Sequence, residues 1–222
     1  KFAITPNIDR LAAMGTTFTN THTQQAICAP ARASLLTGLR PDLTEVWDLE
    51  TQMRDKNPEI LTIPQHFKEN GYSTVGMGKI FDNRSVDKKL DGPSWSKPFK
   101  RFSVNHKIHG PNITGFQSTE NKNILSEIKD QGEAEGIPNG QMWQYIRSKY
   151  KPSTESFDIS DDGYIDGVMA LEAIKEIDNL HDDESPFFLA VGFVKPHLPF
   201  VAPKKYWDMY DRDKLPLAEY QK

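Results

Sequence analysis

Apolar residues recur at helical spacing in several stretches of the chain, and residues that favour helix ends bound these stretches. Residues 5–15 place Ile8 and Leu11 on one face, and residues 30–37 end at Gly38. Glycine favours the position just after a helix, because it adopts the left-handed conformation without strain. We therefore predict helices here and in two further stretches, residues 62–71 and 160–177.

Apolar stretches between these helices predict strands. Residues 72–77 follow one predicted helix directly, and residues 187–194 are almost continuously apolar, as in strands that are buried on both faces of a sheet. Residues 16–19 contain β-branched and aromatic side chains, which predict a third, short strand. The alternation of helices and strands indicates an α/β fold around a mostly parallel sheet.

Hydrophobic periodicity fades between residues 82 and 160, where proline, glycine, asparagine and lysine accumulate. Within this region only residues 121–129 and 141–149 have a locally helical pattern. Long irregular stretches inside a compact domain are often functional loops. We therefore interpret residues 82–160 as an irregular insertion on the substrate side of the domain.

Composition and charge narrow the possible functions. The 222 residues, of which 37% are hydrophobic, suit one globular domain. The formal net charge of −4 lacks the positive excess typical of nucleic-acid binding, so we predict no nucleic-acid partner. The longest apolar run is too short to cross a bilayer, and we predict no membrane span. The single cysteine, Cys28, excludes an intrachain disulfide and matches no zinc-ligand spacing.

Cys28 has the surroundings that point most clearly to chemistry. It lies just before the predicted helix of residues 30–37, where free amides and the helix dipole favour an anion, and Arg32 follows one turn later. A nucleophile and a guanidinium would then meet at one oxyanion. The same spacing also fits a small buried cysteine beside a solvated arginine, and spacing alone does not decide between the two.

A longer pattern surrounds this cysteine. The motif Cys28-x-Pro30-x-Arg32, followed by Thr37-Gly38, resembles the signature of type I sulfatases, in which the cysteine is converted to formylglycine. The resemblance is greatest for the iduronate-2-sulfatase branch, and it implies an alkaline-phosphatase-like α/β sandwich with a mostly parallel central sheet. It extends in the same order through residues 5–12, 62–72, 78–81 and 186–200.

The resemblance implies catalytic roles for four residues. The formylglycine made from Cys28 would be hydrated, and one of its hydroxyls would attack the sulfur of a sulfate ester. Arg32 and Lys79 would bind the sulfuryl oxygens as cations. His197, just beyond the apolar stretch that ends at residue 194, would protonate the leaving alkoxide.

Two further residues are predicted to bind substrate. Asp82 stands three residues after Lys79, where the branch commonly has a histidine. Either Asp82 accepts a hydrogen bond from the hydrated formylglycine, or that role is vacant. Lys195 lies two residues before His197, and we expect it to bind an acidic group on the sugar.

The resemblance also implies a calcium ion, which requires oxygen ligands. Cys28, as formylglycine, would supply one ligand, and the others are expected before Lys1 and beyond Lys222. We therefore expect residues 1–222 to be a partial N-terminal piece of a sulfatase catalytic domain, truncated at both ends and inactive alone. One acidic group lacks the spacing of a calcium loop and better fits a helix start: Asp158, Asp161, Asp162 and Asp166.

The implied activity is that of a sulfuric ester hydrolase acting on a sulfated carbohydrate, with a uronic-acid-containing glycan as the expected substrate. A formylglycine-generating maturation enzyme is the expected partner. The expected location is the periplasm or exterior of a bacterium, or the lysosome of an animal cell. Two alternatives stay open: a phosphodiester or phosphonate monoester hydrolase that uses the same motif, and a non-catalytic glycan-binding fragment.

Overall fold

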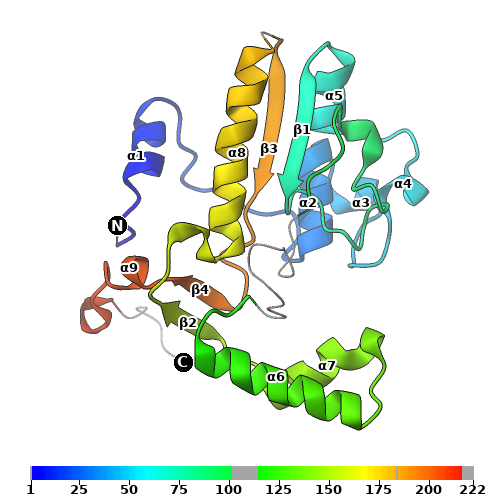
Figure 1. Ribbon diagram of the computed structural model, residues 1–222. Helices are drawn as coiled ribbons and strands as arrows, with labels where there is room; N and C mark the ends of the chain where they lie inside the picture. Colours follow the sequence, from blue (N-terminus) through cyan, green and yellow to red (C-terminus); the bar gives the residue numbers. More distant parts are fainter. Residues whose placement is uncertain (1, 102–114, 184, 217–222) are drawn as a thin grey trace.

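A pair of parallel strands forms the centre of the fold. The computed structural model describes residues 2–101, 115–183 and 185–216, and every structural statement below refers to them. Strand β1 (Ser73–Gly78) pairs in parallel with β3 (Phe187–Gly192). Helix α8 (Ile165–Asp182) runs beside them, with α5 (Ile63–Glu69) next to β1 (Figure 1). The predicted α/β architecture with parallel strands is therefore confirmed.

Side chains from the two strands alternate between two faces, and a helix packs on each face. On one face Met77 packs with Leu189 and Val191 against Met169 of α8. On the other face Phe188 stacks on Phe67 of α5, with ring centroids 4.8 Å apart. Because successive strand residues point to opposite faces, the short pair of strands holds helices on both sides.

The N-terminal part of the chain is helical, as predicted in three places. The opening helix and the helix after the cysteine both form, and the side chain of Thr62 caps α5 by accepting from the amide of Gln65. The strand predicted over residues 16–19 is wrong: these residues form no strand, since strand propensity counts only where a partner strand is adjacent. The helices in this part are α1 (Pro6–Ala13), α2 (Cys28–Thr37), α3 (Pro41–Thr44), α4 (Met53–Lys56) and α5.

The prediction that the strand at residues 187–194 is buried on both faces is also wrong. The side chains of β3 are only partly buried, and Phe187 is 39% exposed. One edge of β3 pairs with β1, and in the described part of the chain no strand lies on its other edge. One face of α8 is also apolar and exposed, at Leu171, Ile174 and Ile177.

The region between residues 82 and 160 is more regular than its composition predicts. Helices α6 (Thr119–Ala134) and α7 (Asn139–Lys149) pack together, and α6 is longer than the predicted stretch. A second parallel pair consists of β2 (Thr154–Phe157) and β4 (Phe200–Pro203), which precedes the short helix α9 (Lys204–Trp207). Among the described helices none has the length and hydropathy needed to cross a membrane.

A buried carboxylate joins these helices to the rest of the fold. Glu155 of β2 accepts hydrogen bonds from the backbone amides of Gln117 and Ser118, from Asn121 Nδ2 and from Tyr164 Oη, at 2.6 to 3.0 Å. Burial alone would raise the pKa of Glu155, but the hydrogen bonds outweigh burial and hold that pKa below its ordinary value. As an ionised group, Glu155 therefore ties the residues at the start of α6 to Tyr164, which directly precedes α8.

Replacing Glu155 with glutamine should lower the free energy of unfolding by about 2 kcal/mol near neutral pH, because a neutral amide cannot accept all four bonds. A carboxyl group whose pKa is lower in the folded state stabilises the fold above its unfolded pKa, and this stabilisation disappears as the pH falls through the folded value. Urea unfolding should therefore show a smaller difference between Glu155→Gln and wild type at about pH 3 than at about pH 7.

The matched control is Glu133→Gln, which removes an exposed ion pair with Lys129 and should cost less than about 0.5 kcal/mol. A loss for Glu155→Gln that stays the same at both pH values would contradict an ionised Glu155.

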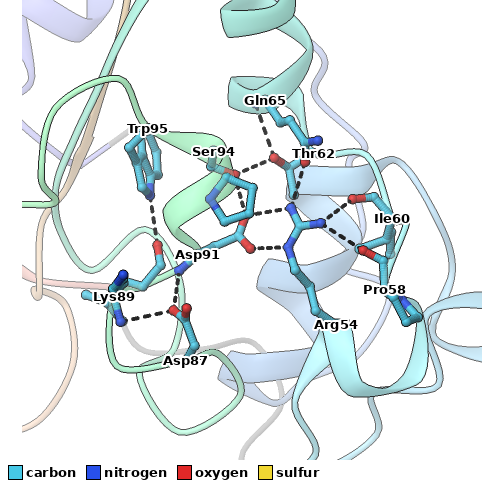
Figure 2. Close-up of polar contacts among 12 residues, drawn as sticks. Arg54, Pro58, Ile60, Thr62, Gln65, Asp87, Lys89, Asp91, Ser94 and Trp95 are labelled. Carbon is cyan, nitrogen blue, oxygen red and sulfur yellow. Dashed lines mark hydrogen bonds and ion pairs between the residues drawn. The ribbon is translucent and has the colours of Figure 1, made fainter.

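A second polar network holds the loop that follows β1 (Figure 2). The guanidinium of Arg54 in α4 forms an ion pair with the buried carboxylate of Asp91, and it also donates to Gln65 Oε1 at 2.7 Å. The amide of Met53 donates to Ser85 O at 3.1 Å. Helix α4 thus bonds to this loop at Asp91 and at Ser85. The same loop contains the candidate site residues Lys79 and Asp82.

Candidate active site

The carboxyl ends of β1 and β3 meet at one edge of the fold. Gly78 and Gly192 are register partners, and the amide of Lys79 donates to Gly192 O at 2.6 Å. Gly78 has a φ of +77°, and a Cβ on either glycine would lie 2.3 Å from the opposite backbone. Both positions therefore need glycine. Ligand sites in open α/β folds collect at such strand ends.

Helix α2 places the cysteine beside this edge. The helix begins at Cys28 itself, two residues earlier than predicted, and ends at Gly38 with a φ of 71°. Ala29 and Ala33 pack in the core, so one face of α2 is fixed. The partly buried Cys28 side chain lines a cavity of about 780 Å³ together with Arg32.

Arg32 connects α2 to the loop after β1. Its Nη1 donates to the carbonyl oxygens of Lys79 and Ile80, the second at 3.0 Å. Burial lowers the pKa of Arg32, and the nearby Cys28 and Asp82 partly offset that effect. The guanidinium thus orients the backbone from which the Lys79 side chain projects.

Lys79 points back toward the cysteine. Its Nζ lies 3.6 Å from Cys28 Sγ and 3.9 Å from Asp82 Oδ2. The structure therefore brings together three of the four predicted catalytic side chains, Cys28, Arg32 and Lys79, although they come from two segments far apart in sequence. A thiol or its oxidised product at residue 28 would face a primary ammonium group.

Asp82 is buried beneath this site. Its side chain is 2% exposed, and its two carboxylate oxygens accept from Arg84 Nε at 2.8 Å and Arg84 Nη2 at 2.9 Å. Burial alone would raise the pKa of Asp82, but the bonds from Arg84 and the charges of Arg84 and Lys79 lower it below its ordinary value. The sequence analysis does not predict a role for Arg84. Its position two residues after Asp82 is the one sequence feature that could have indicated this ion pair.

The two predicted residues beyond β3 have hydrogen-bond partners within their own loop. Lys195 Nζ donates to His197 O at 3.0 Å and to Pro199 O at 2.6 Å, and burial lowers the pKa of Lys195. His197 Nδ1 lies 2.7 Å from Leu198 O. Within the described ranges neither side chain forms a hydrogen bond with Cys28, Arg32 or Lys79. Their predicted roles therefore stay predictions.

Acidic residues near the start of α8 have structural partners. Asp166 accepts from the amides of Val194 and Lys195, both at 2.8 Å, and so fixes the start of the loop that carries His197. Asp161 accepts from Lys205 Nζ at 2.7 Å and Tyr206 Oη at 2.8 Å.

The predicted calcium ion does not fit the described residues alone. These residues include no group of three or more His, Cys, Asp or Glu side chains that could hold a metal ion. The carboxylate of Asp82, which lies 3.9 Å from Lys79 Nζ, is already neutralised by Arg84. A calcium ion needs six or more oxygen ligands, and one from residue 28 would not suffice.

Comparison with known proteins bears directly on this arrangement. A family model described as "Sulfatase" matches residues 1–222. Iduronate 2-sulfatase of Mus musculus is 36% identical over 98% of this chain, and the Homo sapiens protein of that name is 35% identical over the same share. In each case the chain spans only 35% of the relative's length.

Solved structures also share the fold. The phosphonate monoester hydrolase of Agrobacterium radiobacter aligns with a TM-score of 0.55 over 97% of this chain and 41% of that chain, at 23% identity. At that identity the likeness bears on the fold alone.

Proposed function

The chain belongs to the sulfatase family and has its alkaline-phosphatase-like α/β fold, and from this we propose that the protein hydrolyses sulfate esters of a carbohydrate. The observation that carries the proposal is the meeting of Cys28, Arg32 and Lys79 at the strand ends, with Lys79 Nζ 3.6 Å from Cys28 Sγ. A side-chain nucleophile beside two fixed cations suits attack on an anionic ester.

Conversion of Cys28 to formylglycine fits this setting. When hydrated, that group supplies a hydroxyl that can attack sulfur and a second hydroxyl that allows sulfate to leave. Lys79 is positioned to neutralise charge on the sulfuryl oxygens, because its ammonium already lies within contact distance of the residue 28 side chain. Arg32 holds the Lys79 backbone and adds a second positive charge beside α2.

Proton transfer to the leaving alkoxide is the role we propose for His197. It lies on the loop that begins at the carboxyl end of β3, and Asp166 fixes the start of that loop through two backbone amides. A protonated imidazole can donate a proton to an alkoxide.

The substrate we propose is a sulfated sugar of a uronic-acid-containing glycan, and the proposed maturation partner is a formylglycine-generating enzyme. Two of the relatives are named iduronate 2-sulfatase, which supports this substrate class. We also propose a periplasmic, secreted or lysosomal location, as the family resemblance implies, and a calcium ion whose other ligands are supplied from outside the described residues.

Comparison of ester classes tests the proposal. The protein purified from its own host, with whatever sequence flanks residues 1–222 there, should hydrolyse a sugar sulfate with a kcat/KM at least about 100-fold above that for the matching sugar phosphate or phosphonate ester. A preference for the phosphorus esters would instead indicate the phosphodiester or phosphonate monoester hydrolase alternative. Binding of the sugar without turnover of either ester would indicate a glycan-binding protein.

Replacing Lys79 with methionine should lower kcat for the sulfate ester by about 100- to 1000-fold, because one cation facing the reacting group is lost. Methionine keeps the length of the side chain. The control, Lys122→Met, removes a lysine of α6 that donates to Gln117 Oε1, and it should leave kcat within about threefold. A wild-type kcat in Lys79→Met would contradict a catalytic role for Lys79.

A further inference from the structure

We propose that Arg84 selects substrates that carry a second anionic group, a carboxylate or another sulfate, beside the sulfate ester. This inference rests on the proposed function and extends it to a residue outside the sulfatase motif described above. Three observations lead to it: a cavity that joins Arg84 to Lys79, the way Asp82 holds the guanidinium, and the engagement of Lys195 elsewhere.

The cavity lies at the carboxyl end of β1 and has a volume of about 340 Å³. Its charged lining consists of Lys79, Arg84, Arg101 and Asp82, three cations and one carboxylate. A monoanionic sulfate ester would therefore leave one positive charge unmatched, and a second anionic group on the same sugar would match it. The cavity suits a dianionic sugar better than a monoanionic one.

Arg84 is held in place but keeps part of its guanidinium available. Its Nε and Nη2 donate to the two oxygens of the buried Asp82 carboxylate, whereas Nη1 donates no hydrogen bond to any of the described residues. The side chain is 52% exposed. A guanidinium fixed on one edge by a buried carboxylate can bind an incoming anion through its other edge with little further loss of conformational entropy.

Arg101 lines the same cavity. Its Nη2 donates to the carbonyl oxygen of Lys88, which ties this second guanidinium to the loop after β1. By contrast, the Lys195 ammonium, which the sequence predicts for an acidic group of the sugar, already donates to two carbonyl oxygens of its own loop. Arg84 is therefore better placed than Lys195 for that task.

Three sugars test the selection: a hexose with one sulfate ester, the corresponding uronic acid with the same ester, and the hexose with a second sulfate. Arg84→Gln should lower kcat/KM for the two dianionic sugars about 10- to 50-fold more than it lowers kcat/KM for the monoanionic sugar, mainly through KM. If the uronic acid loses more kcat/KM, the second anionic group is a carboxylate. If the disulfated hexose loses more, it is a sulfate.

Two further variants control this comparison. Arg84→Lys retains the charge and should recover at least part of the preference for dianionic sugars. Arg147→Gln removes an arginine that lies over the Trp143 ring on α7, and it should leave all three sugars unchanged. An equal loss of kcat/KM for all three sugars in Arg84→Gln would overturn the inference, because it would mean that Arg84 serves the site only through Asp82.

A binding measurement separates this inference from the proposed function. Dissociation constants of the same three sugars, measured by calorimetry, need no turnover. If wild type hydrolyses none of the sugars, the proposed function fails, and the binding data still decide the role of Arg84. Tighter binding of dianionic sugars that disappears in Arg84→Gln supports selection by Arg84, and equal binding of all three sugars contradicts it.

Discussion

Replacing Cys28 with alanine should lower kcat for sulfate-ester hydrolysis by at least about 10⁴-fold, because the variant has no group at this position that can become a nucleophile. Cys28 is the first residue of α2, and its Sγ is the atom toward which Lys79 points at 3.6 Å. No other cysteine is present in the chain to replace it. The measurement is single-turnover hydrolysis of a chromogenic sulfate ester by the protein made in its own host.

Ser34→Ala provides a matched control on the same helix. Like Cys28→Ala, it removes one heteroatom from a side chain of α2, and the Ser34 hydroxyl is buried with no hydrogen-bond partner in the described structure. Its kcat should stay within about threefold of wild type. A Cys28→Ala protein that retained activity within tenfold of this control would place the nucleophile elsewhere.

The mass of the peptide that contains Cys28 is a second, independent readout. Wild-type protein from its own host should show an aldehyde oxygen in place of the thiol sulfur. An unmodified thiol in fully active protein would contradict the formylglycine proposal while leaving the role of Cys28 itself open to the alanine test.

Replacing Arg54 with methionine should lower the free energy of unfolding by about 3–5 kcal/mol, because removal of one partner of a buried ion pair leaves the other charge uncompensated. The Asp91 side chain is only 2% exposed, and Arg54 also donates to Ile60 O at 3.0 Å and to Gln65 Oε1 at 2.7 Å (Figure 2). Urea unfolding monitored by tryptophan fluorescence is the measurement, since Trp95 Nε1 donates to Leu90 O next to Asp91.

Two variants show whether the charge or the packing carries this effect. In Arg54→Met/Asp91→Asn no buried charge remains, so the double variant should be more stable than Arg54→Met. Asparagine also tolerates the positive φ of 64° at this residue. Arg40→Met, which breaks an exposed pair with Asp42, should cost less than about 1 kcal/mol. A double variant as unstable as Arg54→Met would show that packing, not charge, dominates.

Local patterns were sufficient to predict the elements that build the site. Helix α2, with Gly38 at its end, and strand β1 after Gly71 both form within two residues of their predicted bounds. Their signals are local, because capping residues and apolar periodicity act within one or two turns. The absence of a strand at residues 16–19 shows where local patterns fail. A strand also needs a partner strand, which the local sequence does not reveal.

The polar contacts of the site could not be predicted in the same way. The spacing at a helix start singles out Cys28 and Arg32, and the resemblance assigns their roles and adds Lys79. The structure brings these three residues together, but neither the bond from Arg32 to the Lys79 carbonyl nor the pairing of Asp82 with Arg84 has a periodic signature. Such contacts depend on the tertiary arrangement of loops. For the same reason the engagement of Lys195 by its own loop was not foreseen.

The parallel register of β1 and β3 also bears on how the protein reaches its native state. Ser73 pairs with Phe187, so β1 leaves the ribosome long before its partner has been synthesised. Contacts this distant in sequence form late, because the closure of a long loop costs entropy before pairing stabilises it. The bond from the Lys79 amide to Gly192 O belongs to this late pairing, whereas Cys28 lies in a helix that can form early. During synthesis Cys28 should therefore remain for many seconds without the Lys79 ammonium group beside it.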